Sequence, residues 1–148
     1  GIWDLQPAVN RMAKLDRERV EEVIRCEQLL EPEKNVCEEN LDMWSREEQI
    51  GSIEMKLSHE KGTLKRNGPP TALASQLKQS DGWLDVTMKE LANKKTAVFV
   101  VLESDGFEIY REIKRKAIEY KVPIGWEPWY TGDPIYFWGN SGRKMTVQ

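Results

Sequence analysis

The stretch TAVFVVLESDGFEIYREIKRKAIEYKVPIGWEPW, which runs from Thr96 to Trp129, decides the predicted fold. It opens with β-branched and aromatic residues that do not alternate with polar ones, which is typical of a strand covered on both faces. A turn and an amphipathic segment follow, and a short apolar run closes the stretch. The order strand, helix, strand predicts a right-handed parallel crossover if the strands containing Val98 and Ile124 are neighbours.

The helix predicted within this stretch has two chemically different faces. Four positions at helical spacing are expected to face the sheet: Ile109, Tyr110, Ile113 and Ala117. Four basic positions are expected to face solvent: Arg111, Lys114, Arg115 and Lys116. A surface for anionic lipid or an anionic polymer is the alternative interpretation of this basic row.

The turn before this helix holds three carboxylates, Glu103, Asp105 and Glu108. In one interpretation Ser104 or Asp105 caps the helix, Glu108 completes a capping box, and Gly106 eases the turn. In the other, the three carboxylates bind a divalent ion at the end of the strand, as in a cytosolic metal-dependent enzyme. No second acidic strand motif follows downstream, so we expect a capped turn and no metal.

Residues 1–50 are predicted to form a helical hairpin. Apolar residues at helical spacing predict one helix over Pro7–Leu30 and a second from Glu33 to about Gln49. Pro32 interrupts the pattern, because a residue that precedes proline disfavours the helical conformation.

Cys26 and Cys37 lie equally far from the Glu31–Pro32 break, and such positions can face each other in an antiparallel hairpin. A disulfide between them would stabilise the fold by about 3 kcal/mol in the chain-entropy model. Two buried thiols in a cytosolic core are the alternative. The cysteine spacing and the single histidine do not fit a zinc site.

The rest of the chain predicts strands and one further helix. Ile53, Met55 and Leu57 alternate with polar residues, which indicates a strand and hairpin, although a continuation of the second helix stays open. NGPP at Asn67–Pro70 is a break. A helix is expected over residues 81–95, with Asp81 as N-cap and Leu84, Met88 and Leu91 on its inner face, and a final hairpin is expected with a turn at Gly139–Gly142.

These elements together predict an α+β fold: a small mixed sheet with packed helices, preceded by a helical hairpin. The expected division is residues 1–50 for the hairpin and 51–148 for the α/β domain.

Aromatic residues are concentrated near the end of the sequence: Trp126, Trp129, Tyr130, Tyr136, Phe137 and Trp138. Core packing is the default explanation. The alternative is an exposed binding surface, for which the candidates are Trp126, Trp129, Tyr136 and Trp138. His59 is the only histidine and is expected at the surface beside a turn, without a catalytic partner. No glycine loop for phosphate is present, and no cofactor is expected.

Charge and composition exclude some classes of protein. The net charge is −3, which argues against nonspecific binding to nucleic acid. Residues 16–48 carry twelve acidic and five basic residues, which indicates a solvated acidic face. No apolar run of about 18 residues occurs. Gly1 before Ile2 and Trp3 is typical either of a residue left by removal of an upstream anchor or of an ordinary trimmed terminus.

The stretch VFVVLESDGFEIYREIKRKAIEYKVPIGWEPW resembles the C-terminal part of soluble domains attached to ExbD/TolR-like membrane proteins, in a planctomycete-like variety. The resemblance covers about a quarter of the chain. Its residues are the strand Val98–Leu102, the turn Asp105–Gly106, the aromatic residues Phe107 and Tyr110, and the segment Gly125–Pro128.

This resemblance implies a periplasmic domain held at the inner membrane by one N-terminal membrane helix. It implies a structural or binding role in an envelope complex for biopolymer transport, beside a membrane protein partner, with a homodimer as a common state and without enzymatic activity. The family's proton-carrying residue lies in the membrane helix, so no motor residue transfers to this sequence. A third interpretation of the sequence is an adaptor protein whose helical hairpin only mediates oligomerisation.

Overall fold

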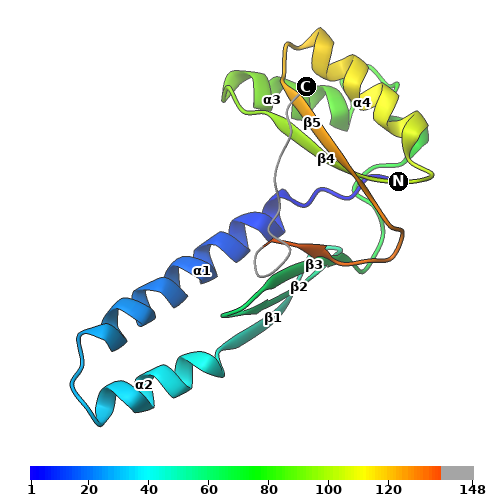
Figure 1. Cartoon of the computed structure of the whole chain (residues 1–148). Helices are drawn as coiled ribbons and strands as arrows, with labels where there is room; N and C mark the ends of the chain where they lie inside the picture. The colour runs from blue at the N-terminus through cyan, green and yellow to red at the C-terminus, as the bar shows by residue number, and fades with distance from the viewer. Residues whose placement is uncertain (138–148) are drawn as a thin grey trace. The chain divides into compact units, whose positions relative to one another are not determined.

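The computed structural model describes residues 1–137, and the fold is α+β, as predicted (Figure 1). Contacts divide the chain into two units. The hairpin unit comprises Asp4–Pro69 and residues 134–137, and the parallel-strand unit comprises Gly1–Trp3 and Pro70–Asp133. This division differs from the expected one at residue 50, because strands β1–β3 belong with the helical hairpin. The chain passes from one unit to the other at the predicted NGPP break.

The helices of the hairpin unit are α1 (Gln6–Glu27) and α2 (Glu33–Asp42). Pro7 lies in the first turn of α1, where its missing N–H has no helical partner to lose. The second helix is shorter than predicted, because Ser45–Ile50 forms strand β1 instead. The hydrogen-bonded pairing of β1 with the apolar strand β2 stabilises the extended conformation more than the helical spacing of its residues stabilises a helix.

Four antiparallel strands complete the hairpin unit in the order β1-β2-β3-β6. They are β1, β2 (Ile53–Ser58), β3 (Gly62–Arg66) and β6 (Ile135–Tyr136). Ile50 pairs with Ile53 across a tight turn in which Gly51 has a φ of +57°. The predicted strand and hairpin are therefore confirmed, and a continued second helix is wrong.

The core of the hairpin unit lies between α1 and one face of this sheet. Alternate residues of the strands are buried, with Met55 and Leu64 both at 0% exposure. Helix α1 contributes Met12 and Leu15, which are spaced so that they lie on one helical face. Burying one such side chain contributes about 2 kcal/mol, so this face orders the otherwise polar helix.

Two helices and a parallel strand pair form the parallel-strand unit. The elements are α3 (Trp83–Asn93), β4 (Val98–Glu103), α4 (Phe107–Glu119) and β5 (Ile124–Trp129), with a short helix η1 at Ala74–Gln76. Val98 pairs with Ile124 in register, which confirms that the two predicted strands are parallel neighbours. Ile2 joins this unit through hydrogen bonds with Thr71 and Ala72.

Strand β4 is less covered than its sequence predicts. Leu102 is its one buried residue, and the other five are half-buried. The reason is that β4 has a single strand neighbour, β5, in the part of the chain described. The core of this unit is built largely by the helices: Leu84 and Met88 of α3 and Ile113 and Ala117 of α4 are all buried.

The inner face of α4 is mostly as predicted, but Lys116 is not. Tyr110, Ile113 and Ala117 are buried, and Ile109 is half-buried. Lys116 was expected to face solvent, yet it is only 7% exposed. Helix α3 places Asp85 beside it, and this carboxylate compensates the burial of the ammonium.

Both predicted helix caps in this unit are wrong. Helix α3 begins after Gly82, and Asp81 lies before it with a φ of +59°. Helix α4 begins after Gly106 and has no side-chain cap. The Gly106 N–H donates to the Glu103 carbonyl at 2.9 Å, and this tight turn leaves a residue without a side chain at the cap position. Asp105 and Glu108 therefore do not form the expected capping box.

Candidate functional site

The acidic turn does not assemble into a metal site. Asp105 and Glu108 are exposed, and Glu103 is half-buried at the end of β4. Among residues 1–137, no group of three or more histidine, cysteine, aspartate or glutamate side chains could hold a metal ion. The alternative of an enzyme that uses Glu103, Asp105 and Glu108 thus gains no support from the geometry.

The three described aromatic candidates, Trp126, Trp129 and Tyr136, are distributed over both units. Trp126 is half-buried, packs against the core of the parallel-strand unit, and its ring centroid lies 5.8 Å from that of Tyr110. Trp129 donates its indole N–H to the Asp133 carbonyl at 3.1 Å. Tyr136 belongs to the hairpin unit and lies opposite Thr63 on strand β3. Trp138 and the predicted turn at Gly139–Gly142 lie outside the described residues.

Tyr130, which the candidate set left out, is the most exposed aromatic residue in the described part of the chain. Tyr130 follows β5 directly and is 82% exposed. Its sequence neighbour Trp129 is half-buried. Tyr130 is therefore a better surface candidate than Trp126 within the parallel-strand unit.

The hairpin unit contains a cavity of about 290 Å³, here termed the hairpin cavity. Its lining residues come from α1, α2 and the turn after β2: Arg19, Val23, Glu38, Leu41, Asp42 and His59. This volume lies just below the range for ligand pockets, about 300–1,000 Å³. It is therefore suited to one side chain of a partner better than to a drug-sized molecule.

His59 lies deeper than a surface position. Its side chain is 33% exposed, and its Nδ1 atom is buried without a hydrogen-bond partner in the described part of the chain. Its Nε2 atom lies 3.9 Å from Asp42 Oδ1 and 3.6 Å from Glu60 Oε1. Periodicity along β2 could not reveal this position, because it depends on α2 packing near the turn.

The charge of the hairpin cavity is set by its carboxylates. Arg19 is already engaged, because its Nε and Nη2 atoms both donate to Asp16 Oδ1 at 3.0 and 2.9 Å. Glu38 and Asp42 belong to a segment, residues 16–48, that carries twelve acidic and five basic residues. A cationic group is therefore the electrostatically favoured occupant of this cavity.

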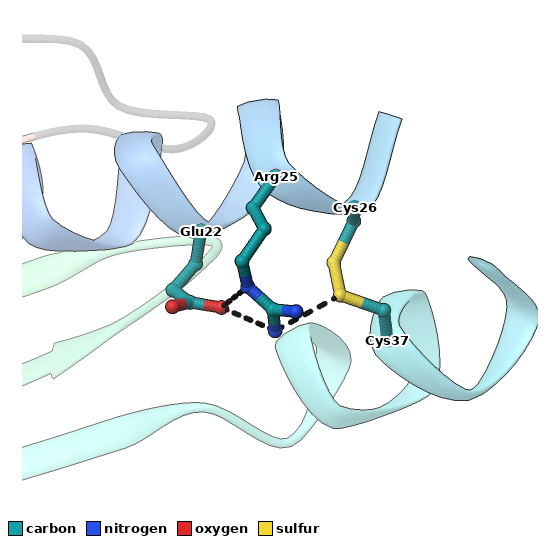
Figure 2. Close-up of a disulfide and its surroundings, with 4 residues drawn as sticks. All are labelled: Glu22, Arg25, Cys26 and Cys37. Atoms are coloured by element: carbon teal, nitrogen blue, oxygen red, sulfur yellow. Dashed lines mark hydrogen bonds and ion pairs between the residues drawn. A yellow bond between two sulfur atoms is a disulfide. The ribbon is translucent and has the colours of Figure 1, made fainter. Parts of the chain in front are cut away.

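A disulfide joins Cys26 of α1 to Cys37 of α2, with Cα atoms 5.5 Å apart (Figure 2). This separation is typical of disulfides, and both cysteines are buried. Arg25 extends toward the bond: its Nη2 atom lies 3.4 Å from Cys37 Sγ and also donates to Glu22 Oε2 at 2.8 Å. Hydrogen bonding to Glu22 raises the pKa of Arg25, so the guanidinium stays charged beside the disulfide.

Helix α1 is also tied to the sheet by an ion pair. The Arg11 guanidinium donates two hydrogen bonds to the Glu48 carboxylate of β1, both at 2.7 Å. This pairing lowers the pKa of Glu48, despite the opposing effect of partial desolvation. Helix α1 is therefore linked to α2 by the disulfide and to β1 by this ion pair.

A buried polar cluster joins the two helices of the parallel-strand unit. Lys116 Nζ lies 2.5 Å from Asp85 Oδ1, and Tyr120 donates its hydroxyl to the same oxygen at 3.3 Å. The second oxygen of Asp85 accepts the Asp81 N–H at 2.8 Å. Because its two carboxylate oxygens accept from three donors, Asp85 can remain ionised in a buried position.

The cluster shifts the pKa of each titratable member. Hydrogen bonding from Lys116 lowers the pKa of Asp85, and burial opposes this effect. Hydrogen bonding to Asp85 raises the pKa of Lys116. Burial, and then the charge of Asp85, raises the pKa of Tyr120. All three members are therefore held in the protonation state that supports the contact between α3 and α4.

The class of this protein is defined by its fold and by the sites described above. Within residues 1–137, no helix has the length and apolar character needed to cross a membrane. Comparison of the chain with family models, curated proteins and solved structures gives no match. The class defined by the structure is an α+β protein with a disulfide-linked helical hairpin.

Proposed function

We propose that this chain is a non-enzymatic, extracytoplasmic part of a membrane-anchored protein, with a binding or structural role in a cell-envelope complex of the ExbD/TolR-like type. The observation that carries this proposal is the Cys26–Cys37 disulfide. Disulfides persist in oxidising compartments such as the periplasm and are rare in the cytosol. The sequence resemblance over Val98–Trp129 supports the same compartment and anchorage at the inner membrane.

In this binding role, the hairpin cavity receives a side chain of a partner protein. Its volume of about 290 Å³ suits a single side chain, and its acidic surroundings favour a lysine or arginine. The disulfide holds α1 and α2 on either side, so the cavity is preorganised and less entropy is lost on binding. The partner is accordingly an envelope or membrane protein that presents a basic side chain.

Thiol trapping in intact cells tests the compartment. Cells that express the full-length protein are quenched with acid, and free thiols are alkylated before any reduction. We expect Cys26 and Cys37 to remain unmodified until a reductant is added, as measured by the mass of the peptides. Quantitative alkylation of both cysteines in the first step would contradict an extracytoplasmic location.

Site-directed cross-linking tests the binding role. A photoreactive residue at Leu41, inside the hairpin cavity, is expected to cross-link a membrane-fraction protein at or beside a lysine or arginine. The same residue at Val36, which lies on α2 outside the cavity, is the matched control. Glu38→Lys combined with Asp42→Lys should abolish the cross-link, whereas Glu21→Lys should not. A cross-link that survives the double charge reversal would contradict a cationic partner.

A further inference from the structure

Helices α3 and α4 end with the same backbone arrangement. In α3 the Thr96 N–H donates to Leu91 O at 2.9 Å, and the Lys95 N–H donates to Ala92 O at 3.2 Å. In α4 the Val122 N–H donates to Ala117 O at 2.8 Å, and the Lys121 N–H donates to Ile118 O at 3.2 Å. Both ends are Schellman motifs, which require a residue in the left-handed region just after the helix.

In each motif that left-handed residue is a lysine. Lys95 has a φ of +52°, and Lys121 has a φ of +58°. Glycine is the usual residue at this position, because a Cβ atom makes the left-handed conformation unfavourable. Two lysines therefore occupy the positions at which their backbone conformation is least favoured.

Strand register brings these lysines to one end of the parallel pair. Each lysine precedes its strand by three residues, and the first residues of the two strands, Val98 and Ile124, pair directly. Both lysines line a single cavity of about 230 Å³. Its other lining residues are mostly apolar: Leu91, Ala92, Thr96, Val122 and Pro123.

Compensation of the helix dipoles does not explain these lysines. Lys94 already lies at the C-cap of α3, and Lys116 lies in the last turn of α4, where a cation offsets the dipole without left-handed backbone. Neither Lys95 nor Lys121 forms an ion pair with any side chain in residues 1–137. Two lysine residues thus line a mostly apolar hollow and have no ion-pair partner among the described side chains.

We propose that this cavity binds a small organic carboxylate, with its carboxylate between Lys95 and Lys121 and its apolar group against Leu91 and Val122. The lysines supply the charge, and Leu91, Ala92, Val122 and Pro123 supply apolar contacts for a short alkyl group. Thr96 adds no free donor, because its hydroxyl already donates to Lys94 O. An inorganic anion would use the lysines but leave the apolar lining exposed to water.

Titration of the full chain, labelled with ¹⁵N, tests the proposal with hexanoate as the probe. Hexanoate should shift the amide resonances of Lys95, Thr96, Lys121 and Val122 saturably. Acetate, inorganic phosphate and 1-hexanol should each bind at least tenfold more weakly, because each lacks either the alkyl chain or the charge.

Two variants separate binding from folding. Lys95→Gly with Lys121→Gly should keep or raise the Tm, since glycine favours the left-handed region, while hexanoate binding falls at least tenfold. Lys95→Gln with Lys121→Gln removes the charges and retains side chains, and should lose binding equally. Lys114→Gln, on the exposed face of α4, should bind hexanoate like the unaltered protein.

Three results would overturn the proposal. The absence of a saturable shift with hexanoate would show that the cavity does not bind an organic carboxylate. Equal binding of phosphate and hexanoate would assign the site to charge alone. Undiminished hexanoate binding by both double variants would place the ligand elsewhere on the protein.

Discussion

At the scale of single residues, Asp85 and Lys116 hold α3 and α4 together through a buried ion pair. Their side chains are 5% and 9% exposed. A buried pair of this kind contributes modestly as a whole, because desolvation offsets much of the attraction. Loss of one partner is costly, since the other charge then stays buried without compensation.

We therefore expect Lys116→Met to lower the Tm of the parallel-strand unit by more than about 10 °C. Methionine fills a similar volume, so the loss reports the unpaired Asp85 carboxylate and not a cavity. Asp85→Leu combined with Lys116→Met should recover most of that Tm, as measured by circular dichroism. A double variant as unstable as Lys116→Met alone would show that packing, not charge, causes the loss.

The same pair predicts the acid sensitivity of this unit. The pKa of Asp85 in the folded chain lies below the ordinary value of 3.8, mainly because Lys116 donates to it. The unfolded chain therefore takes up a proton first as the pH falls. The stability that Asp85 contributes is present above its unfolded pKa and is lost as the pH falls through its folded pKa.

We expect the Tm of the unaltered chain to fall more steeply than that of Asp85→Asn between about pH 5 and pH 2. The asparagine variant starts from a lower Tm, because Lys116 loses its counter-ion, so the slopes and not the absolute values are compared. Thermal unfolding at several pH values measures this. Parallel slopes would mean that Asp85 is not ionised against Lys116 in the folded protein.

At the scale of elements, the disulfide links the last turn of α1 to the middle of α2 near the tip of the hairpin. Both helices are polar overall, and α2 has Cys37 as its one buried residue. Helix α2 is short, so little intrinsic helix stability remains without this link. The cross-link restricts the unfolded chain and so favours the folded hairpin.

Cys26→Ser with Cys37→Ser is expected to lower the free energy of unfolding of the hairpin unit by about 3 kcal/mol, the entropy of closing a loop of this length. Urea denaturation of the oxidised and variant proteins measures the difference. Arg25→Ala is the control for the neighbouring guanidinium, which is exposed and should change stability little. A double variant as stable as the oxidised protein would contradict a stabilising role of the disulfide.

Elements with one strong local pattern could be predicted from the sequence, and elements defined by partners could not. Helix α4 was predicted because its apolar residues have a clear helical period, and strand β5 because a short apolar run follows that helix. Strand β1, SREEQI, has little apolar character, and its pairing with β2 is what makes it a strand. The polar sequence around it fitted a helix equally well.

The candidate sites show the same limit. The Cys26–Cys37 pairing could be proposed because both cysteines flank one break symmetrically. The acidic turn was assigned to capping from residue types alone, but the tight turn at Glu103–Gly106 moved the cap to a glycine. Burial of Lys116 and the shared cavity of Lys95 and Lys121 depend on contacts between helices, which periodicity along one helix cannot reveal.

At the scale of the whole molecule, the chain builds two units that are not continuous in sequence. It enters the hairpin unit at Asp4, leaves it at Pro69, and returns with residues 134–137, where β6 pairs with β3. Each unit nevertheless has its own buried core. Separate cores are the usual basis for separate cooperative unfolding.

We expect the two units to respond separately to changes in each core, as measured by amide hydrogen exchange of the full chain. Reduction of the disulfide should lower protection in α1, α2 and β1–β3, with little change in α3, β4, α4 and β5. Lys116→Met should give the opposite distribution, because it leaves a charge unpaired only in the parallel-strand unit. Disulfide reduction and Lys116→Met serve as controls for each other, because each is expected to destabilise only one of the two units. A uniform loss of protection across residues 1–137 after either change would show one cooperative unit, and the division by contacts would then have no thermodynamic counterpart.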